Sequence, residues 1–412
     1  MSGEVLFLSH RIPFPPNRGD KIRSHHVLRH IAGLAPVHVA TFSDDAADMA
    51  YEGELAALAA SHRLIQRRKS LVRAGLEAVA QGQPVSLTAF HDPELADYVR
   101  RVLAERPVGT IYAFSGQMGQ YIPASYKGRV IFDFVDVDSA KFEAYGEAGK
   151  GPRSWIDARE GRILATEEAR LARRSDVSLF VSNEEAALFR ARLLPQDRLE
   201  CDVRALRNGI DAALFDPDGC VPAPAMLAAS SPRLIFTGQM DYAPNVAAAR
   251  RVIERLLPNV HRACPGASFH VVGRNPPDSL KTFHGTGNVF VHGAVDDMRS
   301  YLAAADLALV PLELARGVQN KVLEAMAMEL PVVLTADAAT GIGGTHGKHY
   351  TVADSDEELA QSVIDLFADP SRRGAIGTSA RQLVIDKLSW PATLAPLAGM
   401  LGLAETAARD AA

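Results

Sequence analysis

The sequence has little cysteine and no long apolar run. Its 412 residues include only three cysteines, Cys201, Cys220 and Cys264, whose spacing fits neither a disulfide framework nor a metal site. A reducing cytosolic compartment is therefore expected. No stretch of about 18 apolar residues is present, so we expect no membrane-spanning helix. The apolar run at residues 5–8 is too short for the core of a signal peptide.

The sequence also lacks an excess of basic residues. Its formal net charge is -5 and its isoelectric point is about 6.2, which argues against a general nucleic-acid-binding protein. Acidic and basic residues balance in residues 1–211, so residues 212–412 carry the whole negative charge. The N-terminal half is thus the better candidate to face an anionic surface or acceptor. Hydrophobic residues make up 47% of the chain, enough for two buried cores.

Short apolar runs alternate with longer helical patterns along the whole chain. This alternation predicts parallel, doubly wound α/β sheets. In the first half, the predicted strands are residues 4–9, 37–42, 62–66, 108–114, 129–134, 177–182 and 202–208. The predicted helices there are 20–33, 45–60, 70–81, 93–104, 158–173 and 183–191.

A second alternation of the same kind follows a segment that is rich in proline, alanine and serine. Its predicted strands are 232–238, 267–273, 288–293, 306–312, 331–335 and 349–352, and its predicted helices are 245–262, 296–304, 319–328 and 356–367. We therefore predict two Rossmann-like domains in tandem. The expected boundaries are 1–215 for the first domain, 216–232 for the linker, 233–388 for the second domain, and 389–412 for a C-terminal helix that packs back on the first.

The segment 311–333 carries the strongest chemical signal. A strand ends at Pro311, a glycine-containing loop follows, and a helix is predicted to start near Gln319 and Asn320. A helix start offers free backbone N–H groups and partial positive charge, which suits a diphosphate. Lys321 and Glu324 are three residues apart and share a helix face, so Lys321 could neutralise phosphate and Glu324 could accept bonds from a ribose diol. An ordinary ion pair on a solvated helix is the alternative.

This segment resembles the donor signature of the family-4 glycosyltransferases, Glu-x7-Glu followed by Ala-Met-Ala-x-Gly-x-Pro-Val-Val. The resemblance implies the α/β GT-B fold, two Rossmann-like doubly wound domains facing a central cleft. It assigns Glu324 to the nucleotide ribose. Arg316 stands where the family has its first glutamate, which alters the usual contact to the donor sugar, and Glu329 replaces the glycine.

Other segments of the second half extend the resemblance. Residues 236–249 resemble the start of the donor domain, where Gly238 would let the backbone approach the diphosphate and Asn245 would stand at a helix N-terminus. The basic residues that many relatives carry in this loop are absent, which leaves more of the phosphate charge to Lys321. In relatives, the loop corresponding to Gly293 and Val295 packs on the nucleotide base.

The first half resembles a narrower lineage. Segments 14–31, 132–145 and 388–397 are similar to sugar transferases associated with bacterial exosortase (PEP-CTERM) and exopolysaccharide systems. Gly19 follows the first strand at the ligand-binding edge of the sheet and is expected to approach the donor phosphate or the acceptor. A plain strand-to-helix turn is the alternative. The expected acceptor-side residues are Arg18, Asp20, Ser139 and Lys141.

No catalytic base can be named from the sequence. The candidates are Ser115, which follows the fourth strand where many relatives carry a histidine, and Asp136 and Asp138, which follow the fifth. The Asp-x-Asp pattern suggests a GT-A metal site, but a second domain holds the donor signature, so we expect no metal and no cofactor. Residues near 138 can equally cap the next helix. His10, His25 and His26 are possible substitutes for the missing histidine, with structural roles as the alternative.

A basic run precedes an apolar stretch in the first half. The run consists of Arg63, Arg67, Arg68, Lys69 and Arg73, and the stretch is 76–80. It could dock on an anionic membrane, or it could be a solvated helix face.

The function expected from the sequence is transfer of a sugar from a nucleotide-diphosphate sugar to a glycan or lipid-linked acceptor in exopolysaccharide biosynthesis. The resemblance implies a retaining, metal-independent reaction in the cytoplasm, with the inner face of the cytoplasmic membrane as an alternative location. A nucleotide-sugar epimerase and a non-catalytic nucleotide-sugar-binding paralogue are the alternatives. A dehydrogenase is disfavoured because the first strand lacks a Gly-x-Gly-x-x-Gly loop.

Overall fold

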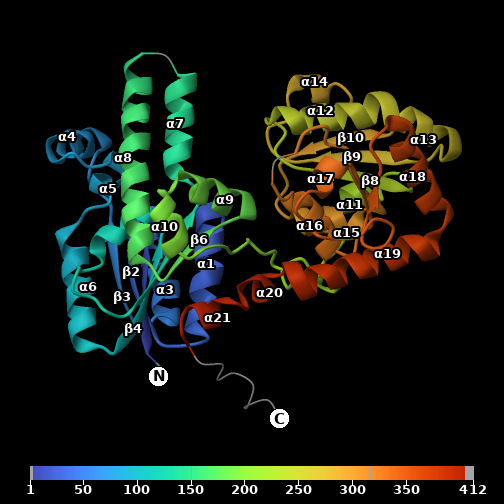
Figure 1. The fold of residues 1–412 in the computed structure, drawn as a ribbon. Coiled ribbons are helices and arrows are strands. Elements are labelled where there is room, and N and C mark those ends of the chain that lie inside the picture. Colours follow the sequence, from blue (N-terminus) through green and yellow to red (C-terminus); the bar gives the residue numbers. More distant parts are fainter. Residues whose placement is uncertain (1–2, 150, 316, 404–412) are drawn as a thin grey trace, which may run out of the picture. The chain divides into compact units, whose positions relative to one another are not determined.

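The chain forms two compact α/β units. The computed structural model in Figure 1 describes residues 3–149, 151–315 and 317–403. The first unit runs to Asn208 and takes up the chain again from Thr393, and the second is Gly209–Ala392. Within the described residues, the two sheets have seven and six strands, and every pairing is parallel. The predicted class of fold, two doubly wound α/β domains, is confirmed.

The sheet of the first unit has the order β3-β2-β1-β4-β5-β6-β7. Its strands are β1 (Glu4–Ser9), β2 (Val37–Ser43), β3 (Ser61–Gln66), β4 (Val108–Phe114), β5 (Arg129–Val135), β6 (Val177–Phe180) and β7 (Val203–Ala205). Helices cover the sheet on both faces, so the central strands are buried throughout and read as continuous apolar runs.

Helices of the first unit connect these strands. They are α1 (Gly19–Ala32), α2 (Ala46–Met49), α3 (Glu52–Leu58), α4 (Leu71–Gln81), α5 (Val85–Ala89), α6 (Pro93–Glu105), α7 (Asp138–Ala148), α8 (Pro152–Arg174), α9 (Asn183–Arg192), α10 (Pro195–Glu200) and α21 (Leu397–Met400), with a 3₁₀ helix at Gly116–Tyr121. The helix predicted at 45–60 is two short helices, and the predicted 158–173 helix begins at Pro152.

The long hairpin of α7 and α8 stands out from the first unit in Figure 1, and the sequence did not predict α7. Its two helices touch through glycines. A Cβ on Gly146 would come within 2.9 Å of the Ala158 nitrogen, and one on Gly161 within 2.8 Å of Glu143 Cγ. Helix α7 contacts α8 through glycines and buries only Ser139, so the apolar periodicity that reveals sheet-covering helices is missing.

The sheet of the second unit has the order β10-β9-β8-β11-β12-β13. Its strands are β8 (Arg233–Thr237), β9 (Ser268–Val272), β10 (Val289–Gly293), β11 (Leu307–Val310), β12 (Val332–Leu334) and β13 (Thr351–Val352). Its helices are α11 (Pro224–Leu227), α12 (Ala243–Arg251), α13 (Leu257–Ala263), α14 (Asp278–Lys281), α15 (Met298–Ala304), α16 (Asn320–Ala327), α17 (Ala336–Ala339), α18 (Asp356–Ala368) and α19 (Pro370–Leu383).

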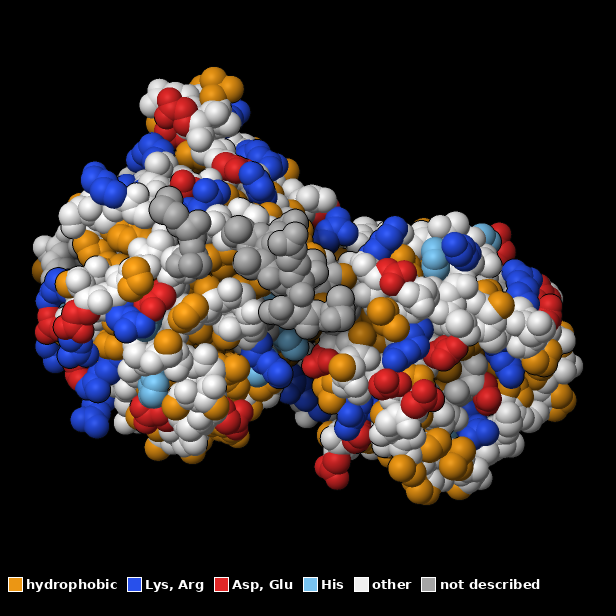
Figure 2. All heavy atoms as spheres, turned by 90° about the horizontal axis from the view of Figure 1, so that it is seen from below, with side chains coloured by type: hydrophobic (Ala, Val, Ile, Leu, Met, Phe, Trp, Pro, Cys, Tyr) orange, Lys and Arg blue, Asp and Glu red, His pale blue; other side chains and the backbone are white. Residues whose placement is uncertain are grey.

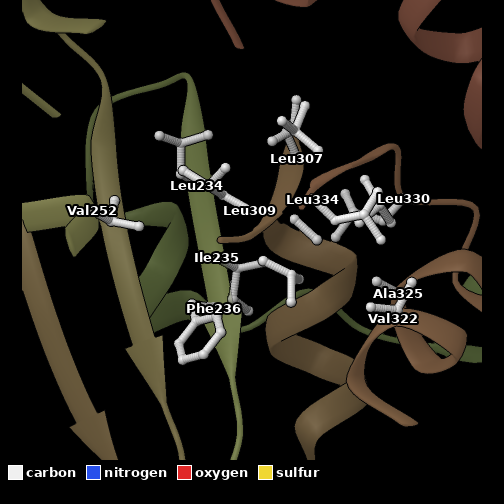
Figure 3. Packing of buried hydrophobic residues seen from close by; sticks show 14 of the residues in the cluster. Leu234, Ile235, Phe236, Val252, Leu307, Leu309, Val322, Ala325, Leu330 and Leu334 are labelled. Atoms are coloured by element: carbon white, nitrogen blue, oxygen red, sulfur yellow. The ribbon is translucent and has the colours of Figure 1, made fainter. Parts of the chain in front are cut away.

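Apolar side chains from β8 and β11 meet those of α16 in the core of the second unit. Figure 3 shows Phe236 and Ile235 of β8 near Leu309 of β11, with Val322 and Ala325 of α16 farther along the same core, close to Leu330. Because α16 packs its apolar face on the sheet, its first turn is held at the carboxyl end of β11. This packing fixes Lys321 and Glu324, which lie on the same helix.

The boundary between the two units lies after Asn208, earlier in the chain than the predicted linker at 216–232. Residues 216–232 lie inside the second unit, where Met226 of α11 is fully buried and the Ala223 nitrogen donates to the Ser300 carbonyl at 2.8 Å. Helix α20 (Trp390–Leu394) spans the return boundary. Beyond it, Thr110 Oγ1 of β4 donates to the Leu401 carbonyl at 2.8 Å, which ties the C-terminal segment to the first unit.

Surface charge and helix length agree with the composition. On the face drawn in Figure 2, basic and acidic side chains are interspersed. Among residues 3–149, 151–315 and 317–403, each helix is too short or too polar to cross a lipid bilayer.

Candidate donor and acceptor sites

The candidate donor site lies in the second unit where the strand order reverses. Strand β8 has β9 on one side and β11 on the other, so the connections that leave β8 and β11 diverge at the carboxyl edge. Ligands of doubly wound sheets bind at this point. The loop after β8 leads to α12, and the loop after β11 leads to α16.

Three glycines allow the loops at this edge to pack backbone against backbone. Gly238, Gly273 and Gly293 follow or end β8, β9 and β10, with φ of 150°, 154° and 72°. The Gly238 nitrogen donates to the Val272 carbonyl at 3.1 Å, and the Gly273 nitrogen donates to the Gly293 carbonyl at 2.8 Å. A Cβ on Gly273 would lie 1.6 Å from the Gly238 oxygen, so no side chain fits there.

A hydrogen bond between Lys321 and Asn245 connects the first turns of α16 and α12, the helices that follow the two loops. Lys321 Nζ donates to Asn245 Oδ1 at 2.5 Å and lies 4.9 Å from the centre of the Phe236 ring. Asn245 is buried in the first turn of α12, and its Nδ2 donates to the Gln239 carbonyl at 2.9 Å. The ammonium group is thus held beside Gly238, where a Cβ would meet Lys321 Cε at 3.4 Å. A fixed positive charge next to closely approaching backbone is suited to phosphate oxygens.

Burial changes the acidity of the two charged groups of α16. It lowers the pKa of Lys321 to about 8, although the Glu324 carboxylate acts to raise it. Burial also raises the pKa of Glu324, and the Lys321 charge opposes that rise. No described residue donates a hydrogen bond to the Glu324 carboxylate, so its oxygens are available to a ligand.

The remaining predicted donor residues lie close by in the chain. Gln319 is the N-cap of α16, with its Nε2 donating to the Gly317 carbonyl at 3.1 Å, and Asn320 is the first helical residue. Val295 is half-buried on the loop after Gly293 and packs on the core. Arg316 lies outside the described residues.

The structure adds Gly273 and Arg274, which the sequence analysis did not select. With its amide oxygen turned toward Arg274, Gln239 accepts hydrogen bonds from Nη2 and Nε at 2.5 and 2.9 Å. The Met240 nitrogen also donates to the Arg274 carbonyl at 2.9 Å. A second cation therefore stands at the loop after β8. Arg274 follows the neighbouring strand β9, so the sequence of the β8 loop alone does not indicate it.

At low pH the Lys321 ammonium group is charged and can bind a diphosphate without taking up a proton. Because its pKa in the free protein is about 8, we expect donor affinity to fall about ten-fold between pH 7 and pH 9. Titration calorimetry with a nucleoside diphosphate measures this. Lys321→Arg, which stays charged over the whole range, is the matched control and should abolish the fall. An equal fall in both proteins would assign the pH dependence to another group.

Two of the predicted acceptor-side residues, Arg18 and Asp20, lie near the end of β1. Arg18 Nε donates to Asp20 Oδ1 at 2.9 Å, and Arg11 Nη1 donates to Asp20 Oδ2 at 2.9 Å. Burial acts to raise the pKa of Asp20, but the hydrogen bond from His10 and the Arg11 and Arg18 charges hold it well below its usual value. A Cβ on Gly19 would meet nothing within 4 Å, so the unit itself does not require glycine there.

His10 is the buried histidine at this edge. Its ring stacks on Phe114 at 5.8 Å, its Nε2 lies 3.5 Å from Asp20 Oδ2, and its Nδ1 is buried without a partner among the described residues. His25 is a packing residue instead: its Nδ1 lies 3.1 Å from the Pro13 carbonyl, and its ring contacts Phe14. The ring of His26 packs edge-on against that of His25.

The ends of β4 and β5 bring together a polar cluster. Lys141 Nζ donates to Asp136 Oδ2 at 2.7 Å and to Asp138 Oδ1 at 3.4 Å, and burial raises the Asp138 pKa against the Lys141 charge. Among the described residues, no three His, Cys, Asp or Glu side chains lie together as metal ligands would.

Two serines accompany this cluster. Ser115 adopts φ 76°, and its Oγ donates to Gln117 Oε1. Ser139 is buried, and its Oγ donates at 2.6 Å to Glu168, a carboxyl group whose pKa burial raises to about 7. Glu168 was not selected from the sequence because it lies on α8, 29 residues beyond Ser139.

Two parallel, doubly wound units of this kind, each with polar loops at a switch point, define the GT-B class of fold. Residues 231–369 match the family model described as "Glycosyl transferases group 1". The chain is 27% identical over 58% of its length to a GDP-mannose-dependent alpha-(1-6)-phosphatidylinositol monomannoside mannosyltransferase of Mycolicibacterium smegmatis. It is 29% identical over 45% of its length to the GDP-mannose-dependent monoacylated alpha-(1-6)-phosphatidylinositol monomannoside mannosyltransferase of Corynebacterium glutamicum.

A solved structure agrees over nearly the whole chain. Anabaena HepE in complex with UDP and glucose is similar with a TM-score of 0.58 and 15% identity, covering 97% of this chain and 99% of that one. At this identity the likeness concerns the fold. The matches to the two curated mannosyltransferases span 65% and 52% of their lengths.

Proposed function

We propose that the protein is a glycosyltransferase that moves a sugar from a nucleotide-diphosphate sugar to a glycan or lipid-linked acceptor. The observation that carries the proposal is the Lys321–Asn245 pair beside Gly238, at the switch point of the sheet that matches the group 1 model. The names of the two mannosyltransferases and the UDP of the HepE complex support a nucleotide-diphosphate sugar as the donor.

The donor diphosphate would meet Lys321, the free N–H groups at the start of α16 and the backbone around Gly238. Charge that develops on the leaving diphosphate would be stabilised by groups already held in place by the core of the second unit. Glu324, on the same face of α16 as Lys321, would accept hydrogen bonds from the ribose hydroxyls. In this arrangement the protein supplies position and charge.

Replacing Glu324 with alanine should weaken binding of a nucleotide sugar about ten- to a hundred-fold, because a charged hydrogen bond contributes roughly 1.5–3 kcal/mol. Titration calorimetry measures the change. Glu357→Ala, at an exposed position of α18 in the same unit, is the matched control and should bind like the wild type. Unchanged affinity in a folded Glu324→Ala protein would remove Glu324 from the donor site.

The proposal includes a metal-independent reaction with retention of configuration. Lys321 and the helix start would meet the phosphate charge without a cation, so turnover should survive EDTA. NMR of the anomeric linkage in the product tests the stereochemistry. Abolition by EDTA with rescue by manganese would support a metal site at Asp136 and Asp138 instead, and an inverted anomeric centre would refute a retaining mechanism.

The proposal further places the enzyme in exopolysaccharide biosynthesis of the exosortase-associated kind, with a growing lipid-linked polysaccharide as acceptor. The similarity of segments 14–31, 132–145 and 388–397 to such transferases supports it. Such an acceptor would bring the enzyme to the inner face of the cytoplasmic membrane. Turnover of nucleotide sugars against lipid-linked glycans tests this. Conversion of the donor sugar without an acceptor would instead identify an epimerase, and binding without turnover a non-catalytic paralogue.

A further inference from the structure

Helix α4 exposes the side chains that a helix of a globular protein normally buries. Four large apolar side chains share one arc of this helix and are 65% to 77% exposed: Leu71, Val72, Leu76 and Val79. The two residues that α4 buries completely are the small Ala74 and Ala78. At 100° per residue, the exposed apolar arc spans about 140° of the helix. A contiguous exposed apolar face marks an interaction surface.

Helix α4 is firmly anchored with this face outward. Ser70 Oγ caps its N-terminus by accepting from the Arg73 nitrogen at 3.3 Å, and Gly82 ends it with φ 65°. On the buried side, Thr88 Oγ1 of α5 donates to the Ala74 carbonyl at 2.9 Å, and Arg159 Nη2 of α8 donates to the Ala78 carbonyl at 3.3 Å. The apolar face is therefore a fixed feature of the folded unit.

Helix α8 lies beside α4 and α5 and carries two more exposed apolar side chains. Figure 1 shows α4 and α5 beside α8, and Glu160 of α8 accepts from the Val85 and Ser86 nitrogens of α5 at 2.9 and 3.0 Å. Trp155, 64% exposed, and Ile156 lie one helical turn before Arg159, on the same side of α8. Tryptophan is favoured at the boundary between water and lipid because its ring is apolar with a polar N–H.

Basic side chains flank this apolar surface on both sides. A hollow of about 790 Å³ on one flank has five basic and three acidic side chains in its lining, with Arg63, Arg67, Arg68, Lys69 and Arg73 as the basic ones. A second hollow of about 740 Å³, between α8 and the end of α4, has three basic and one acidic, with Arg159, Arg162 and Arg170 as the basic ones.

Three of these arginines form no ion pair with any residue that the structure describes: Arg68, Arg159 and Arg162. Arg159 donates only to backbone carbonyls. In contrast, Arg67 pairs with Asp44 at 3.2 Å and Lys69 with Glu77 at 2.8 Å. The surface thus carries local positive charge on a chain whose net charge is -5.

We propose that this docking face, the apolar side of α4 with Trp155 and Ile156 of α8, binds a membrane that carries anionic phospholipids. The apolar side chains enter the interface, and phosphate headgroups meet the flanking arginines. This proposal also identifies where the enzyme would meet a lipid-linked acceptor. That role rests on the proposed function, whereas membrane binding by the docking face does not. Charge complementarity favours the membrane, because arginines without an ion pair among the described residues, beside an exposed apolar face, match anionic headgroups beside acyl chains.

Flotation of the full-length protein with lipid vesicles tests the docking face. Vesicles of phosphatidylcholine with one quarter phosphatidylglycerol should carry the wild type, and vesicles of phosphatidylcholine alone should carry much less. The double variant Val72→Ser/Leu76→Ser should lower the vesicle-bound fraction at least ten-fold, because two side chains that enter the interface are lost. Both positions are exposed, so the fold should be unaffected.

Matched controls come from the same unit. Leu199→Ser removes an 89% exposed leucine of α10, outside the docking face, and should float like the wild type. Arg68→Ala/Arg162→Ala should weaken binding to anionic vesicles and make it less sensitive to salt, whereas Lys127→Ala, at an exposed position elsewhere, should not.

Three outcomes would overturn the proposal. They are a wild type that does not float with anionic vesicles, a serine variant that floats unchanged, and sedimentation showing a dimer that Val72→Ser/Leu76→Ser dissociates. Nucleoside diphosphate binding, measured on the same proteins, should be unaffected by these variants. If the wild type does not bind a nucleoside diphosphate, the proposed donor site is refuted, but the result on membrane docking is unaffected.

Discussion

Gly273→Ala should destabilise the second unit by more than about 3 kcal/mol and abolish nucleotide binding, although the mutation removes no functional group. A Cβ at this position would overlap the Gly238 carbonyl oxygen at 1.6 Å, and φ of 154° is itself unfavourable for alanine. The loops after β8 and β9 must separate to accept it. Asn245 is held by the Gln239 carbonyl of the loop after β8. Moving this loop would therefore displace the Lys321–Asn245 pair and disrupt the proposed diphosphate site.

Thermal unfolding and calorimetric titration of a nucleoside diphosphate measure the two effects of Gly273→Ala. A loss of this size corresponds to a fall of roughly 10 °C in the unfolding midpoint of a unit this large. Gly374→Ala is the matched control, because a Cβ there has nothing within 4 Å and lies on the helix α19, where alanine is favoured. A Gly273→Ala protein that melts and binds like Gly374→Ala would show that the loops at this edge do not pack as described.

The second large effect is expected at Asp133 in the first unit, where Asp133→Ala should cost about 3–5 kcal/mol. Asp133 accepts two hydrogen bonds from the fully buried Arg23, at 2.9 and 3.1 Å, and one from Tyr112 at 2.6 Å. Without the carboxylate, the Arg23 charge is buried and only partly compensated by the Leu206 carbonyl and Asn208. The pair ties α1 to β5 and to the exit of β7.

Denaturant unfolding of Asp133→Ala gives this loss. Adding Arg23→Met to Asp133→Ala should recover part of it, because the uncompensated charge is then gone. Asp97→Ala, which breaks the exposed ion pair of Asp97 with Arg100, is the surface control and should change stability by less than about 1 kcal/mol. If the double variant is less stable than Asp133→Ala alone, the buried charge is not the source of the loss.

Strand positions were predictable because both sheets are buried on both faces. A strand such as β1 or β8 must then be apolar at nearly every residue, and such runs are visible in the sequence. Helix α7 was not predictable, because it packs on one neighbouring helix through Gly146 and Gly161. The sequence predicted the linker at 216–232, whereas the boundary between the units lies after Asn208. Proline and alanine suggest a loop, but the burial of Met226 depends on α15, which lies far along the chain.

For the donor site, local patterns selected Gly238, Asn245, Lys321 and Glu324, and the structure brings the first three together. Gly273 and Arg274 were missed because their importance comes from the neighbouring strand β9. The basic run before α4 was visible as well. The sequence could not show that the leucines of α4 face outward, because the hydrophobic pattern of an amphipathic helix is the same whichever side the helix buries.

The sequence by itself therefore determined the elements and the chemical types: two doubly wound units, a strand-loop-helix segment with Lys321 and Glu324, and a basic, apolar helix at 70–81. Only the tertiary structure decided which loops meet and which faces stay open. The physical reason is that propensity and periodicity act over a few residues. The contacts that assemble the site, Lys321 with Asn245 across 76 residues and Arg23 with Asp133 across 110, exist only once the sheets have formed.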